Sequence, residues 1–133
     1  MPQTIDKLKN ERGQTFTELA LALPILVGLI FGIAQFGIAF NNYLTLTDAA
    51  RAASRKGAVS RTVSNPANVC QSAGYAAGGG LKNPGKDFKV TCSSSWLPGT
   101  DLTVTATYPY SIKLLNWVVA KGTLTSTMKE RVE

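Results

Sequence analysis

The chain has 133 residues, a formal net charge of +6 and no histidine. This length holds one small domain and one long helix rather than two full domains. The lack of histidine excludes a Ser-His-Asp triad and the commonest zinc ligand, and the scattered basic residues, without interleaved aromatic side chains, do not predict nucleic acid as the primary partner.

The first predicted element is a long N-terminal helix with an apolar first half. Residues 19–40 carry no charge and one strongly polar side chain, Gln35. A helix of that length rises about 33 Å, which is enough to cross the hydrocarbon core of a bilayer. A helix in a small soluble domain would show a polar face, and the apolar region of a secretory signal is usually only about 7–15 residues long. The run therefore indicates a helix that crosses a membrane or is buried in an assembly.

The helix is expected to continue through an amphipathic, alanine-rich half over residues 41–59. No proline or glycine lies between Gly37 and Gly57, so we predict one helix from about Phe16 to Lys56. Four residues are expected to bend the apolar half or to open faces for close helix packing: Pro24, Gly28, Gly32 and Gly37. Positive charges flank the apolar run on both sides, so the charge pattern does not orient the helix.

Residues 60–133 are expected to form a small α+β domain. Ser64-Asn65-Pro66 predicts the start of a second helix, and the glycines at 78–80 predict its end. Apolar and polar residues then alternate in three half-buried strands, over residues 88–92, 102–110 and 123–132. Residues 97–101 are expected to join the first two strands as a hairpin.

A second short helix is expected between the last two strands. Ser111 is a capping residue, Ile112, Leu115 and Val119 follow at helical spacing, and Gly122 is expected to end the helix. The predicted fold class is therefore α+β: a long N-terminal helix, a three- to four-stranded antiparallel sheet and one or two short helices.

Two cysteines and two tryptophans each allow two interpretations. Cys70 and Cys92 are expected to form a disulfide if the domain lies outside the cytoplasm, and to be unpaired buried thiols otherwise. Two cysteines do not suffice for a four-thiolate metal site. Trp96 and Trp117 are either packing residues or exposed anchors for a partner or a membrane.

The residues before the apolar run resemble a processing signal. A short charged leader ends in Gly13, and Glu18 is the fifth residue after it, at the edge of the run. This arrangement resembles the class III signal of type IV prepilins. The resemblance implies cleavage between Gly13 and Gln14 by a prepilin peptidase, with residues 1–13 as the leader and 14–59 as the mature helix. It also implies that Glu18 pairs with the amino terminus of a neighbouring subunit; the alternative is a solvated residue at the headgroup level.

The resemblance narrows to the TadE-like pseudopilins of tight-adherence (Flp) pilus systems. Its motifs are the stretches 12–18, 35–37, 46–55, 108–110 and 123–133. The resemblance does not extend to residues 60–100, and Gln35 stands where the family often has Glu. The implied partners are the peptidase, other copies or other pilins in a helical filament, and the inner membrane before assembly. The implied location is the inner membrane for the precursor, with residues 60–133 as an extracytoplasmic domain, and the cell-surface pilus after assembly.

Three classes of function remain at this point. The first is a structural pilin-like subunit, major or minor, of a type IV or Tad-type pilus. The second is a membrane-anchored module that binds or assists assembly without polymerising. The third is an enzyme, which we do not expect, because no paired acids, metal-ligand spacing or phosphate-binding loop is present. We accordingly assign no catalytic residue, metal or cofactor.

Overall fold

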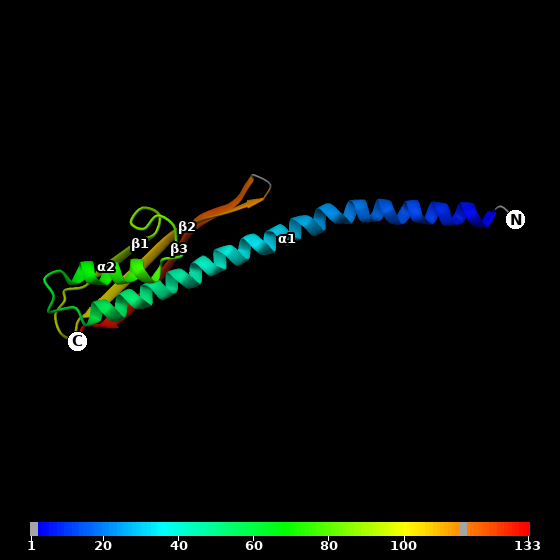
Figure 1. The fold of residues 1–133 in the computed structure, drawn as a ribbon. Coiled ribbons are helices and arrows are strands. Elements are labelled where there is room, and N and C mark those ends of the chain that lie inside the picture. The colour runs from blue at the N-terminus through cyan, green and yellow to red at the C-terminus, as the bar shows by residue number, and fades with distance from the viewer. Residues whose placement is uncertain (1–2, 115–116) are drawn as a thin grey trace.

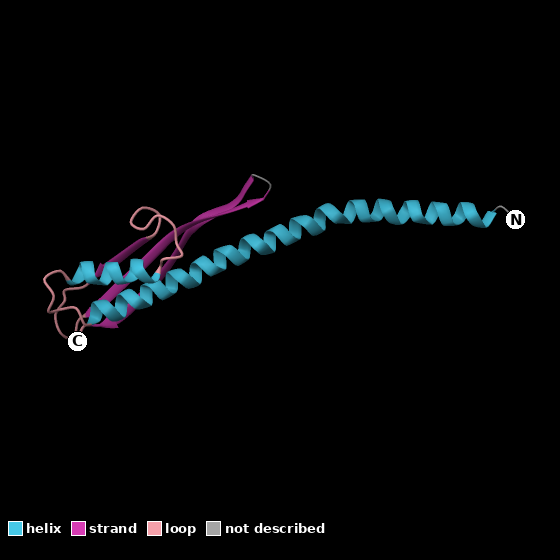
Figure 2. Cartoon of the chain, in the orientation of Figure 1, coloured by secondary structure: helices cyan, strands magenta, loops and turns pink. Residues whose placement is uncertain are grey.

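The computed structural model describes residues 3–114 and 117–133. One long helix, α1 (Gln3–Ala58), extends far beyond a small domain that contains the rest of the chain (Figure 1). The domain consists of a second helix, α2 (Pro66–Ala77), and three strands, β1 (Lys89–Ser93), β2 (Asp101–Leu114) and β3 (Trp117–Arg131). Figure 2 shows both helices on the same side of the sheet. The α+β fold class is confirmed.

Helix α1 is longer than the sequence predicted. It begins at Gln3 rather than near Phe16, passes through Pro24 without a break and ends at Ala58. Residues 3–12 are rich in Lys, Glu, Gln and Arg, which are good helix formers, so they continue the helix toward the N-terminus. Residues 3–12 and the apolar half therefore share one helix.

Helix α2 begins and ends at the predicted signals. The Asn65 side chain accepts a hydrogen bond from the Asn68 N–H at 3.1 Å, and Pro66 occupies the first turn. At the other end, the Gly78 N–H donates to the Gly74 carbonyl at 2.9 Å. These local bonds satisfy backbone groups that the helix leaves unpaired at its ends.

The sheet is antiparallel with the strand order β1-β2-β3. Strand β1 pairs with the first part of β2, from Lys89 opposite Thr107 to Ser93 opposite Thr103. Strand β3 pairs with β2 along its whole length, from Asp101 opposite Arg131 to Leu114 opposite Trp117. The sheet therefore has three strands near one end and two at the other.

The short helix predicted after Ser111 is wrong for the described residues. Residues 111–114 and 117–122 form the outer ends of β2 and β3, with Ile112 opposite Ala120 and a register irregularity between Ile112 and Lys113. Leu115 lies outside the described residues. The strands are favoured because Ile112, Val118 and Val119 are β-branched, and because each strand extends a pairing already formed by its neighbour.

The hydrophobic core lies between the second half of α1, α2 and one face of the sheet. Small α1 side chains let the sheet approach, and Phe88 and Leu102 fill the space between the layers. The buried core residues are Leu46, Ala49, Ala50, Ala53, Cys70, Leu81, Phe88, Val90, Leu102, Val104, Ala106 and Val132. Phe88 also packs edge-on against Tyr75, with ring centroids 5.4 Å apart.

A disulfide between Cys70 and Cys92 joins α2 to β1, with Cα atoms 6.4 Å apart. This confirms the predicted pairing and excludes the alternative of two free thiols. A disulfide stabilises a small domain mainly by restricting the unfolded chain. The bond therefore compensates for a core that buries only a modest number of large side chains.

Candidate functional site

Gly13, Gln14 and Glu18 lie within the exposed part of α1. The Gln14 Nε2 donates to Glu18 Oε1 at 3.4 Å, and the Thr17 hydroxyl donates to the Gly13 carbonyl at 2.9 Å. Residues four apart share a helix face, so the structure places the backbone around Gln14 and the Glu18 carboxylate one turn from each other. All four residues are exposed, which leaves this segment accessible in a single copy of the chain.

The apolar half of α1 has almost no contacts with the rest of the chain. Residues 13–58 include one helix long and apolar enough to cross a membrane, and none of its most apolar window is buried. Large exposed side chains surround it, including Phe16, Leu21, Ile25, Leu29, Ile33 and Phe36, all at least half exposed. The chain alone does not shield this surface from water.

The glycines of the apolar half also face open space. A Cβ atom built on Gly28, Gly32 or Gly37 meets nothing within 4 Å. By contrast, a Cβ on Gly57, in the second half, would lie 2.6 Å from a Leu102 methyl carbon and 3.1 Å from Cys70. The first group has no packing role inside a single copy, whereas Gly57 is needed for close contact between α1 and the domain.

The basic cluster Arg51, Arg55 and Lys56 lies on the outer surface of α1. All three side chains are exposed, and Arg51 is 3.7 Å from the exposed carboxylate of Asp48. An exposed pair of this kind contributes little to stability. The cluster is consistent with either a solvated helix face or a contact with lipid headgroups or with an acidic group of a neighbour.

The two tryptophans occupy different environments. Trp96 is half-buried and packs against the hydrophobic core, with its backbone in a left-handed conformation at φ 56°. Trp117 is 81% exposed at the start of β3. Of the two interpretations made from the sequence, packing describes Trp96, whereas Trp117 is an exposed aromatic side chain.

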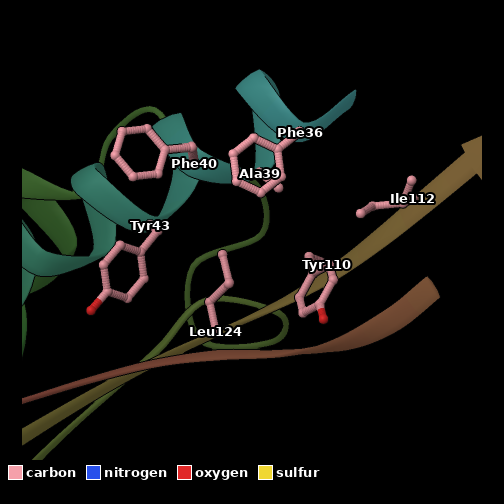
Figure 3. Close-up of a pocket in the computed structure, with 7 residues that line it drawn as sticks. All are labelled: Phe36, Ala39, Phe40, Tyr43, Tyr110, Ile112 and Leu124. Carbon is pink, nitrogen blue, oxygen red and sulfur yellow. The ribbon is translucent and has the colours of Figure 1, made fainter. Parts of the chain in front are cut away.

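An apolar cleft separates α1 from the β2–β3 hairpin. Figure 3 shows aromatic side chains of the helix on one wall and Tyr110 and Ile112 on the other. Its volume is about 270 Å³, and its lining residues are Phe36, Ala39, Phe40, Tyr43, Tyr110, Ile112 and Leu124. Sequence reasoning missed this cleft because it predicted a helix at Ile112; the β-branched content of residues 112–119 was the available signal for a strand.

The described residues include no candidate metal site. They contain no group of three or more His, Cys, Asp or Glu side chains that would hold a metal ion. Every buried side-chain nitrogen or oxygen in this part of the chain has a hydrogen-bond partner. The features that lack a partner within one copy are apolar surfaces, and such surfaces bind lipid or protein.

Comparison with protein families gives one match. Residues 13–55, roughly a third of the chain, match the family of TadE-like proteins. This confirms the family resemblance for the stretch from Gly13 to Arg55, while the likeness of residues 108–133 to the same family stays a prediction. Neither the curated proteins nor the solved structures contain a match to this chain.

Proposed function

Since residues 13–55 belong to the TadE-like family, a non-catalytic family associated with Tad pilus assembly, we propose that this chain is a structural pilin-like subunit. In this proposal a prepilin peptidase first removes residues 1–13. The processed chain then joins a type IV or Tad-type pilus, as a major or minor subunit, through contacts of the helix over residues 14–59. The observation that carries the proposal is the apolar half of α1, which the chain itself leaves uncovered.

The free energy of that exposed surface argues for a partner. Moving one Leu, Ile or Phe side chain out of water is worth about 1.5–3 kcal/mol, and many such side chains surround α1 between Phe16 and Phe40. Lipid tails or other apolar helices remove this surface from water equally well. A helix of this kind is therefore stable in a membrane, and during assembly its contacts with lipid are replaced by contacts with neighbouring copies.

The uncovered glycines support helix-to-helix contact after that exchange. Gly28 and Gly32 are four residues apart, so they share a helix face, and neither contacts any other part of the chain. Small residues at this spacing let two helix backbones approach closely in an apolar environment. Pro24 and Gly37 belong to the same proposed packing segment.

The polar end of the helix supports processing and pairing. Cleavage after Gly13 creates an α-amino group on Gln14, one turn from Glu18. A carboxylate at the edge of an apolar segment is costly to bury unless it has a positive partner, and a neighbouring subunit carries such an amine. Removal of residues 1–13 takes away three basic and two acidic side chains, so the net charge falls from +6 to +5.

The disulfide supports an orientation that the charge pattern left open. Disulfides form and persist outside the reducing cytoplasm, and Cys70 and Cys92 are joined. We therefore propose that residues 60–133 are extracytoplasmic and that the leader is cytoplasmic. The precursor resides in the inner membrane, and the processed subunit joins copies of itself or other pilins at the cell surface.

Intact mass and filament imaging test the proposal together. In cells with a prepilin peptidase, the purified chain is expected to lack residues 1–13, and in cells without the enzyme to retain them. Retention in both strains contradicts the processing step. Processed protein that stays monodisperse and never forms or joins filaments favours instead a membrane-anchored module that does not polymerise.

A Glu18→Gln substitution tests the pairing separately, because it removes the charge while preserving the shape of the side chain. A hydrogen bond to a charged group is worth roughly 1.5–3 kcal/mol, so we expect the yield of assembled subunit to fall by about tenfold or more. The matched control is Asp48→Asn, which neutralises an exposed acid on the second half of α1 and is expected to assemble normally. Normal assembly of Glu18→Gln contradicts the pairing but leaves cleavage intact.

A further inference from the structure

The outer end of the β2–β3 hairpin, residues 109–114 and 117–123, forms an arm outside the main sheet. Strand β1 pairs with β2 only as far as Thr107, so the arm has two strands and no third. Figure 1 shows the arm projecting from the domain in the general direction of the N-terminus and diverging from α1. An isolated two-stranded hairpin is at best marginally stable in water. The arm is therefore expected to need a second surface, outside the three-stranded sheet, that stabilises it.

The end of the arm is both apolar and basic. Three consecutive residues are largely exposed: Trp117 at 81%, Val118 at 54% and Val119 at 65%. Successive residues in a strand point to opposite faces, so apolar side chains emerge on both sides of the arm rather than on one. Exposed lysines, Lys113 and Lys121, flank them. A surface that is apolar on both faces suits insertion into a layer better than docking against one flat protein face.

The position of the arm along α1 sets its depth relative to a membrane. At the far end of the domain, the Glu133 N–H donates to the Ala58 carbonyl, and β2 runs from there back along α1. Tyr110 and Ile112 lie across the cleft from Phe36 and Phe40. Residues 113–114 and 117–119, which continue the arm past Ile112, therefore follow at the level of the C-terminal end of the apolar segment 19–40.

We propose that the end of the arm docks onto the outer interface of the membrane that α1 crosses. Trp117, Val118 and Val119 enter the headgroup layer and the upper acyl chains, and Lys113 and Lys121 contact anionic headgroups. The inference rests on the proposed function, because it requires α1 to be embedded in a bilayer before assembly. The same surface is then released when the subunit leaves the membrane for a filament.

The chemistry of the arm limits it to the interface. Tryptophan and tyrosine concentrate where the bilayer meets water, and lysine side chains extend from apolar surroundings to the headgroups. Deeper insertion is opposed because the open edges of a two-stranded hairpin carry backbone groups that hydrocarbon leaves unsatisfied. Trp117 and Tyr110 are thus placed at the depth that their side chains favour.

Fluorescence quenching by brominated lipid tests this contact in the full chain. The protein is reconstituted in lipid nanodiscs that contain anionic phospholipid, with bromine atoms on the upper acyl chains. Trp96→Phe leaves Trp117 as the single reporter, and Trp117→Phe leaves Trp96, which packs against the core of the domain, as the matched control. We expect Trp117 to lose most of its emission and to shift to shorter wavelength, while Trp96 is not quenched.

A third reporter separates failure of this inference from failure of the proposed function. In a chain without Trp96 and Trp117, the substitution Ile38→Trp, at a residue that is 58% exposed, places a fluorophore near the C-terminal end of the apolar half of α1, at the depth of the upper acyl chains. Quenching of this reporter together with an unquenched Trp117 overturns the docking of the arm and leaves the membrane helix in place. Loss of quenching at both positions contradicts the membrane helix itself, and with it the arm contact.

The lysines give a second, independent readout. The double substitution Lys113→Glu and Lys121→Glu is expected to reduce the quenching of Trp117 severalfold in anionic discs, because each residue then repels the headgroups. The matched control, Lys89→Glu with Lys129→Glu, reverses two exposed charges on the three-stranded part of the domain and is expected to change nothing. Equal quenching in both double variants contradicts the headgroup contact.

Discussion

The two halves of α1 belong to one uninterrupted helix, but the second half packs inside the domain and the first half is exposed. In the second half, Leu46, Ala49, Ala50 and Ala53 are fully buried against α2 and the sheet. In the first half, leucines, isoleucines and phenylalanines are exposed, and the glycines contact nothing. The larger apolar side chains are thus on the half that the chain leaves uncovered.

This difference shows how side-chain size decides what each half of the helix packs against: the chain's own domain for the second half, and lipid or other helices for the first half. Alanines allow the sheet to lie close to the helix, so the second half is complete within one copy. Bulky apolar side chains surround the first half and leave no polar face for water. Its apolar surface is therefore shielded from water only in lipid or among other helices. The same helix is a core element at one end and an intermolecular surface at the other.

The largest expected contrast is between two leucines on the same helix. Leu46→Ala creates a cavity in the core and is expected to lower the free energy of unfolding of the domain by about 4 kcal/mol. Leu29→Ala, at a residue that is 57% exposed, is expected to leave it unchanged. Denaturant titration of the full chain in detergent, followed by Trp96 fluorescence in a Trp117→Phe background, measures both. Equal effects would contradict the division of the helix.

Loss of the disulfide is expected to have the next largest effect, and only on the domain. Cys70→Ser combined with Cys92→Ser removes a crosslink between residues 22 apart in sequence and is expected to cost about 3 kcal/mol of domain stability. The helical signal of the apolar half in detergent should persist, because no contact joins it to the crosslink. Circular dichroism of the helix and Trp96 fluorescence separate the two responses; a simultaneous loss of both signals would contradict independent halves.

The smallest contrast is between two glycines. Gly57→Ala places a methyl group 2.6 Å from a Leu102 methyl carbon and 3.1 Å from the disulfide-bonded Cys70, and overpacking of this kind costs about 1–3 kcal/mol. The higher helix propensity of alanine offsets up to about 1 kcal/mol of that cost. Gly32→Ala meets nothing within 4 Å and should leave domain stability unchanged. Thermal unfolding of the two variants beside the parent chain measures the difference, and a destabilised Gly32→Ala would reveal a contact inside one copy.

Several elements could be predicted from local sequence because their signals are local. The apolar run was long enough to define a membrane-length helix, Asn65-Pro66 marked the start of α2, and the alternation of residues 102–110 defined β2. The two cysteines allowed one disulfide or two free thiols, and the structure contains the disulfide. Capping, periodicity and helix propensity act over a few residues, so they can be recognised from the sequence without the tertiary structure.

Tertiary structure decided the remaining features because they depend on neighbours distant in sequence. Ile112 and Val119 fit a short helix by spacing, yet they lie in paired strands, since the β2–β3 register continues past Tyr110. Ser126, a polar residue of β3, is buried opposite Ala106. The cleft and the exposed arm also arise only when β2 folds back along α1. Sequence determined which segments are apolar, and the fold determined which of them the chain covers itself.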